Sequence, residues 1–104
     1  MVSARSKGMR NEKEFQVILE SEGYVVERVK GGTKWNKQTD FFGLWDLLCF
    51  MPGKHWLLVQ IKTDYRKKVY DDLKAWFDKN NPPNTKVLYA IRRKEDDWRK
   101  EWIK

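Results

Sequence analysis

Cysteine and histidine are nearly absent from this chain, whose 104 residues include one of each. The one cysteine, Cys49, cannot form an internal disulfide, and because it lies within an apolar run we interpret it as a small buried hydrophobic residue. The one histidine, His55, argues against a histidine-based zinc site and against a Ser-His-Asp hydrolase. We expect His55 to be a half-exposed residue at the start of a strand.

Long apolar segments are missing too. No apolar run approaches the length of about 18 residues that a membrane helix needs, and no apolar segment of the signal-peptide kind follows Met1. We therefore expect a soluble, intracellular protein located in the cytoplasm, with no membrane partner. Internal repeats and low-complexity linkers are also absent, so residues 1–104 are expected to form a single domain with a modest core.

Acidic residues are too few to balance the basic ones. The chain has 22 Lys and Arg against 15 Asp and Glu, which gives a net charge of +7 and a pI near 9.6. Such a balance favours a polyanionic partner, and nucleic acid is the natural candidate.

The apolar pattern of the first half predicts a helix followed by strands. Over residues 10–22, one helical stripe holds Phe15, Ile18, Leu19 and Glu22, and Gly23 is expected to end the helix. The β-branched stretch 24–29 predicts a strand, and the apolar runs 44–50 and 55–63 predict two more.

The last two of these strands are joined by turn residues. Met51-Pro52-Gly53-Lys54 predicts a type II turn, in which Pro52 presets its own φ and Gly53 takes a positive φ. The two strands are therefore expected to pair as a hairpin. By alternation, one face of strand 55–63 carries Leu57, Val59 and Ile61, and the other face carries Leu58, Gln60 and Lys62.

The second half predicts a helix and a further strand. Helical spacing relates Val69, Leu73, Trp76 and Phe77, and the Asn and Pro residues at 80–83 close the helix. Strand 86–92 is then expected to join the sheet in parallel through a right-handed crossover, which gives the order αβββαβ. The tail, residues 96–104, fits either a short helix or an edge strand.

Three polar side chains meet at the predicted hairpin. Asp46 stands at the start of one apolar run, and fourteen residues later Gln60 and Lys62 lie on the next. Because polar groups in a core are costly without partners, the pair is expected to open into a cleft; alternatively, the strand emerges into solvent and Lys62 starts an ordinary polar loop. An acid, a carbonyl-bearing side chain and a lysine are what metal-assisted phosphodiester hydrolysis requires.

The order αβββαβ, with Asp46 and Gln60-x-Lys62 on neighbouring strands, resembles the nuclease core of the PD-(D/E)XK superfamily. This resemblance implies an α/β, restriction-endonuclease-like fold with a mixed central sheet flanked by helices. The stretch KGMRNEKEFQVILESEGYVVER, residues 7–28, is similar to the opening of archaeal-type Holliday junction resolvases. The segments that correspond to the family aspartate and to its EVK motif are Gly43-Leu44-Trp45-Asp46-Leu47 and Val59-Gln60-Ile61-Lys62.

The resemblance implies a metal-dependent, structure-selective DNA endonuclease, in particular a Holliday junction resolvase that uses Mg²⁺ or Mn²⁺. It implies that the cation is held by Asp46, the Gln60 amide oxygen, the Ile61 backbone carbonyl and Glu12, the last reached by counting four residues from Gly8. Lys62 would orient the attacking water or stabilise the charge that develops on the phosphate.

Two positions depart from the family pattern. Trp45 stands where the family has a proline, and Gln60 stands where it has a second acid. The site then has two carboxylates, Glu12 and Asp46, so its affinity for metal should fall, although an amide oxygen is still a hard ligand for Mg²⁺. The Mrr-type restriction nucleases of the same superfamily carry a QxK motif, so the substitution is compatible with activity.

Basic residues flank the segments that carry the site. The residues expected to bind DNA are Lys7, Arg10, Arg28, Lys30, Thr33, Lys34, Trp35, Lys37, Arg66, Lys67 and Lys68. Of these, Thr33 either hydrogen-bonds a phosphate or belongs to a plain flexible loop, and Trp35 either stacks on an unpaired base or folds back onto the domain. Asp40 is either an auxiliary metal ligand or a solvated loop acid.

Aromatic residues exceed what so small a core needs, with six Trp, five Phe and four Tyr. A homodimer would cover exposed aromatic area and would supply the two symmetric cuts that a four-way junction needs. The candidates for burial between the subunits are Trp76, Phe77, Trp98 and Trp102. Two other functions stay open: an Mrr-like or phage-type endonuclease acting on duplex or modified DNA, and a catalytically silent DNA-binding module of the same fold.

Overall fold

The computed structural model describes residues 4–28, 44–94 and 97–103, and it describes side chains from residue 10 onward. The elements in chain order are α1 (Ala4–Ser21), β1 (Val25–Arg28), β2 (Leu47–Phe50), β3 (Trp56–Lys62), α2 (Lys67–Asn80), β4 (Thr85–Lys94) and β5 (Asp97–Ile103). Within these ranges no helix is both long and apolar enough to cross a membrane.

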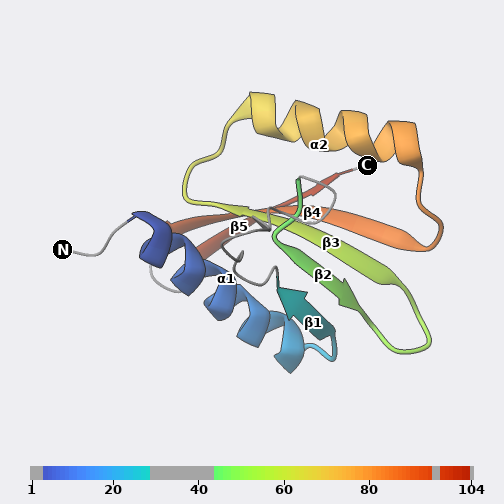
Figure 1. Cartoon of the computed structure of the whole chain (residues 1–104), viewed down its shortest axis with the longest axis horizontal. Coiled ribbons are helices and arrows are strands. Elements are labelled where there is room, and N and C mark those ends of the chain that lie inside the picture. The colour runs from blue at the N-terminus through green and yellow to red at the C-terminus, as the bar shows by residue number, and fades with distance from the viewer. Residues whose placement is uncertain (1–3, 29–43, 95–96, 104) are drawn as a thin grey trace, which may run out of the picture.

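The five strands form one mixed sheet in the order β1-β2-β3-β4-β5. All neighbours are antiparallel except β3 and β4, which are parallel and are joined through α2. In Figure 1 the blue helix α1 covers one face of the sheet and the yellow-to-orange helix α2 covers the other. The α/β fold with a mixed sheet flanked by helices, expected from the sequence, is therefore confirmed.

The tail of the chain is the edge strand β5, so the element order is αβββαββ and the predicted αβββαβ is one strand short. β5 pairs with β4 over most of its length, from Val87 opposite Ile103 to Lys94 opposite Asp97. Since residues 97–103 pair with β4 in this way, the structure adopts the strand alternative over that part of the tail, with Trp98 packed against the core and Trp102 41% exposed.

Helix α1 begins at Ala4, earlier than the predicted start at residue 10, because the apolar stripe used for that prediction starts only with Phe15. It ends at Ser21, and Gly23 follows with φ of 102°, a value that suits glycine, so the predicted stop is confirmed. Glu22, expected on the helical stripe, lies just beyond the helix and is exposed.

The hairpin between β2 and β3 closes as expected. The Lys54 N–H donates to the Met51 carbonyl over 2.9 Å, and Gly53 has φ of 75°, which is the geometry of a type II turn. β2 starts at Leu47, three residues later than predicted, because the chain at 44–46 leaves the regular ladder near Asp46.

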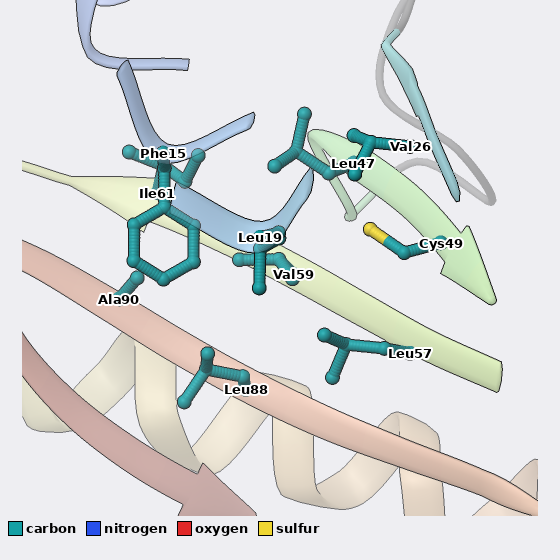
Figure 2. Packing of buried hydrophobic residues seen from close by; sticks show 10 residues of the cluster. All are labelled: Phe15, Leu19, Val26, Leu47, Cys49, Leu57, Val59, Ile61, Leu88 and Ala90. Atoms are coloured by element: carbon teal, nitrogen blue, oxygen red, sulfur yellow. The ribbon is translucent and has the colours of Figure 1, made fainter. Parts of the chain in front are cut away.

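Side chains of β3 alternate between two apolar clusters. The cluster on the α1 side holds Leu57, Val59 and Ile61 together with Phe15 and Leu19 of the helix, as Figure 2 shows. The cluster on the α2 side holds Leu58 with Leu73 of that helix. Gln60 and Lys62 follow Leu58 in the alternation, so they belong to the α2 side of the sheet.

The two residue types that are scarce in the sequence take structural roles. Cys49 is fully buried in the cluster on the α1 side, and burial raises the pKa of its thiol to about 12. His55 lies half-buried just before β3, where its Nε2 is 2.7 Å from the Tyr24 hydroxyl. The structure therefore confirms the roles expected for both residues.

Candidate active site

Asp46 is fixed against β3 by two hydrogen bonds. Its backbone N–H donates to the Val59 carbonyl over 2.8 Å, and its Oδ2 accepts from the Ile61 backbone N–H over 2.7 Å. The residue is 8% exposed, so these bonds form away from most solvent. The Asp46 carboxylate therefore adds a side-chain hydrogen bond between the segment that enters β2 and the end of β3, beside the backbone hydrogen bonds of the sheet.

Gln60 contacts the same carboxylate oxygen. Its amide is oriented by its neighbours: with Nε2 toward Asp46, that nitrogen donates to Oδ2 over 3.1 Å and also to the Leu44 carbonyl, whereas the reverse orientation would set acceptor against acceptor. Gln60 is 6% exposed. Asp46 Oδ2 thus receives two N–H donors, one from the backbone of β3 and one from a side chain of the same strand.

Lys62 is the last residue of β3, two residues after the buried Gln60. It is exposed, and it lines a cleft of about 270 Å³ together with Thr63, Asp64, Arg66 and Val69. The buried amide and the exposed ammonium are therefore two steps along one strand, the first inside the protein and the second at a polar cleft. Lys62 thus lines a cleft, as the first alternative expects, and it is exposed at the end of its strand, as the second expects.

Glu12 lies on the side of α1 that carries the buried residues. It precedes Leu19 by two helical turns, and Leu19 is buried in the core, so both lie on the same side of the helix. Its half-buried state agrees with that placement. Among the members of the expected site, Asp46 is in direct contact with both Gln60 and Ile61.

The sequence patterns did not reveal Tyr89, which holds the connection from Lys62 to α2. Its side chain is fully buried, its hydroxyl donates to the Asp64 carbonyl over 3.0 Å, and it accepts from the Arg66 N–H over 3.1 Å. In the parallel register it stands beside Gln60. An aromatic residue in an apolar strand looks like ordinary core, and only the fold shows that its hydroxyl orders the cleft.

A second residue that the patterns missed is Arg92, which ties β4 to the segment of α1 around Glu12. One guanidinium nitrogen donates to Asn11 Oδ1 over 2.6 Å, and the other lies 3.1 Å from a carboxylate oxygen of Glu14. Asn11 is almost completely buried. The sequence did contain one sign of this contact. Asn11 is a polar residue one turn before Phe15 on the apolar stripe of the helix, where a buried polar group needs a partner.

The residues expected to bind DNA fall into two groups. Arg10, Arg66, Lys67 and Lys68 are exposed, and Arg28 is half-buried at the end of β1. The side chain of Lys7 is outside the described residues, as are Lys30, Thr33, Lys34, Trp35, Lys37 and Asp40. Three of the exposed residues, Arg66, Lys67 and Lys68, lie together where α2 begins, beside the cleft that Lys62 lines.

The chemistry of the donors fits a hard divalent cation in part. Among the described residues, no three Asp, Glu, His or Cys side chains are grouped so as to hold a metal. The carboxylate of Asp46 and the amide of Gln60 do supply oxygen atoms of the kind that Mg²⁺ prefers. The amide oxygen becomes available to a cation if the amide turns over.

Of the four aromatic residues considered for a subunit interface, three contribute to the folded subunit. Trp76 and Phe77 pack against the cluster on the α2 side, where Trp76 meets Trp45 edge to face at 5.4 Å between ring centroids. Trp98 packs on Phe15 at 4.7 Å. Trp102 is exposed, as is Trp56 on β3.

This architecture is a mixed sheet covered by α1 and α2, with Asp46 just before β2 and Gln60 and Lys62 on the neighbouring β3, and it is the fold of a solved resolvase. The chain is similar to a solved structure of Hjc from Archaeoglobus fulgidus, a Holliday junction resolvase of an archaeal hyperthermophile. The match has a TM-score of 0.55 and 19% sequence identity, and it covers 90% of this chain and 74% of that one. No protein-family model matches the chain, and no curated protein matches it either.

Proposed function

We propose that this protein is a metal-dependent DNA endonuclease that cuts branched DNA, most specifically a Holliday junction resolvase. The observation that carries the proposal is the buried contact between Asp46 and Gln60, followed on the same strand by the exposed Lys62, in a resolvase-like fold. The resolvase activity of the Archaeoglobus protein supports the choice of substrate, and the net charge of +7 suits a polyanion.

Each side chain has a distinct task in this proposal. Asp46, with Gln60 and the Ile61 carbonyl, holds the cation, and Glu12 adds a second carboxylate directly or through water. When bound, Mg²⁺ or Mn²⁺ polarises a phosphoryl oxygen and lowers the pKa of water. Lys62, at the cleft, donates hydrogen bonds to the scissile phosphate or to the attacking water, and its positive charge stabilises the charge that develops on the phosphate.

Cleavage of labelled DNA tests the proposal. With Mg²⁺ or Mn²⁺, the protein is expected to introduce paired symmetric nicks in a four-way junction, to leave linear duplex largely intact and to be inactive in EDTA. Equal rates on junction and linear duplex would favour the Mrr-like alternative, for which Gln60 is the specific observation. Binding without cleavage under every metal would favour a DNA-binding module.

Variants locate the chemistry. Asp46→Asn and Lys62→Ala are each expected to reduce cleavage by at least about 100-fold while leaving junction binding largely intact, since an electrostatic group at a phosphoryl-transfer site is worth several kcal/mol. Lys54→Ala is the matched control, because Lys54 is an exposed lysine at the opposite end of β3. Full activity in both site variants would show that the site is misassigned.

We also propose a homodimer as the active form. Trp56 and Trp102 leave apolar area on the surface, and a two-fold pair is suited to two symmetric cuts. Sedimentation at several protein concentrations is expected to show a dimer, and a monomer at all concentrations with full junction cleavage would overturn this part of the proposal.

A further inference from the structure

The acceptors around the Gln60 amide assign its nitrogen, and not its oxygen, to the side of Asp46. In this orientation it bridges the Asp46 carboxylate and the Leu44 carbonyl, so one side chain satisfies two acceptors on the segment that enters β2. Both Asp46 and Gln60 are buried. A hydrogen bond that bridges a buried carboxylate is of the stronger kind, because one partner is charged.

A glutamate at this position could not make that bridge. A carboxylate is an acceptor only, so it would stand opposite two further acceptors, Asp46 Oδ2 and the Leu44 carbonyl. Like charges in contact at a buried site disfavour the folded state unless a cation lies between them. Glutamine places the partly positive hydrogen atoms of its amide against the Asp46 carboxylate. A pair of acids at the same two positions would need a cation between them.

We propose that Gln60 is a positioning residue that locks Asp46 and the Leu44 segment in the metal-free protein through its Nε2 hydrogen atoms. This pair of hydrogen bonds, which we call the lock, joins Gln60 Nε2 to Asp46 Oδ2 and to the Leu44 carbonyl and involves no metal. Its consequence for metal binding rests on the proposed function: a cation at Asp46 competes with the Gln60 amide for the same carboxylate, and the amide oxygen reaches the cation only when the amide turns over and gives up both donated bonds.

Thermal unfolding in EDTA tests the lock without any metal or DNA. Gln60→Glu is expected to lower the unfolding temperature by about 5–15 °C, which corresponds to a buried acceptor left without its donor in a domain of this size. Gln60→Met, similar in shape but without a donor, is expected to lower it by a smaller amount, because it removes the bond without adding a charge.

The double variant Asp46→Asn with Gln60→Glu is the matched control, because it removes one of the two negative charges that face each other in Gln60→Glu. The asparagine oxygen still accepts from the Ile61 N–H, at the position where Asp46 Oδ2 does. At least half of the temperature lost in Gln60→Glu is expected to return. In the wild-type NMR spectrum, the Gln60 side-chain amide, assigned by its loss in Gln60→Met, is expected to be protected from solvent exchange.

If Gln60→Glu and Gln60→Met unfold at the wild-type temperature in EDTA, or if the Gln60 amide protons exchange freely, the lock is wrong. Added Mn²⁺ separates this failure from that of the proposed function. With both ideas correct, Mn²⁺ raises the unfolding temperature of Gln60→Glu more than that of the wild type. A destabilised Gln60→Glu that recovers in the double variant but does not respond to Mn²⁺ upholds the lock and counts against the metal-dependent nuclease.

Discussion

At the scale of single residues, the buried polar groups mark the parts of the protein that position the candidate site. The buried polar residues in the described ranges are Asn11, Asp46 and Gln60. Asn11 receives a hydrogen bond from Arg92, and Asp46 receives its bonds from β3. Because an unpartnered polar group in a core is costly, these contacts are expected to be important for stability as well as for geometry.

Arg92→Ala tests the first of these contacts. The change removes a charged donor from Asn11 and from Glu14, and the Arg92 side chain is 13% exposed, so solvent can replace it only in part. We expect the free energy of unfolding to fall by about 2–3 kcal/mol, measured by urea denaturation. Arg93→Ala is the control, since Arg93 is exposed on the same strand. Similar losses in the two variants would contradict the assigned role of Arg92.

His55 predicts a pH dependence of stability. Burial, and then the charges of Lys86 and Lys54, hold its pKa below the ordinary value of 6.5. Below pH 6.5, the unfolded chain therefore binds a proton at His55 more readily than the folded chain does. The contribution of His55 to the free energy of unfolding is fully present above pH 6.5 and is lost as the pH falls from there through the lower pKa of the folded state. Urea midpoints between about pH 7.5 and pH 6 should fall for the wild type and should change less for His55→Gln. An identical pH dependence in the two proteins would show that another group is responsible.

At the scale of the elements, the connection between β3 and α2 depends on one hydroxyl. Tyr89→Phe keeps the buried ring and removes the bonds to the Asp64 carbonyl and the Arg66 N–H. We expect a loss of about 1–2 kcal/mol in the free energy of unfolding and faster hydrogen exchange at the Arg66 amide.

Tyr24→Phe is the control for that change. It also removes one hydrogen bond, to His55, but at the opposite end of β3. Exchange at Arg66 should not change in this variant. If both variants alter it equally, the Tyr89 hydroxyl does not order the cleft in particular.

Elements with a clear apolar period were predictable from the sequence. The alternation along β3 assigned Leu57, Val59 and Ile61 to one face, and the structure buries them together under α1. The strand β5 was not predictable, because its alternation is hidden by charged side chains and its pairing with β4 is a long-range contact. In the same way, the first turns of α1 hold only Ala4 and Met9 as apolar residues, which are too few to mark a helical stripe.

The candidate site was predictable in its residue types but not in its contacts. Asp46 and Gln60 were expected to meet, and they do, through the amide nitrogen of Gln60. The sequence could not show this orientation, because glutamine carries a donor and an acceptor of nearly the same shape and only its neighbours choose between them. The roles of Tyr89 and Arg92 were hidden for a related reason, since each depends on which distant segment the fold places beside it.

At the scale of the whole molecule, the net positive charge favours the polyanionic partner that the proposed function requires. The excess of basic residues is expected to act mainly through phosphates, and three exposed basic residues lie together at the start of α2 beside the cleft of Lys62. Phosphate contacts release counterions, so the dependence of affinity on salt counts them. That dependence tests whether this end of the sheet is the DNA-binding surface.

If about six basic residues contact phosphates, the logarithm of the binding constant for a four-way junction, measured in EDTA, should fall with the logarithm of salt concentration with a slope of roughly −5. Arg66→Gln combined with Lys68→Gln removes two charges beside the cleft and should reduce the slope to roughly −3, since each lost contact changes it by about 0.9. Lys54→Gln combined with Lys86→Gln removes the same charge at the opposite end of β3 and should leave the slope unchanged. Because both pairs lower the net charge equally, a general attraction between a basic protein and DNA predicts equal effects. A larger effect of the first pair is what a DNA-binding surface at the Lys62 cleft requires.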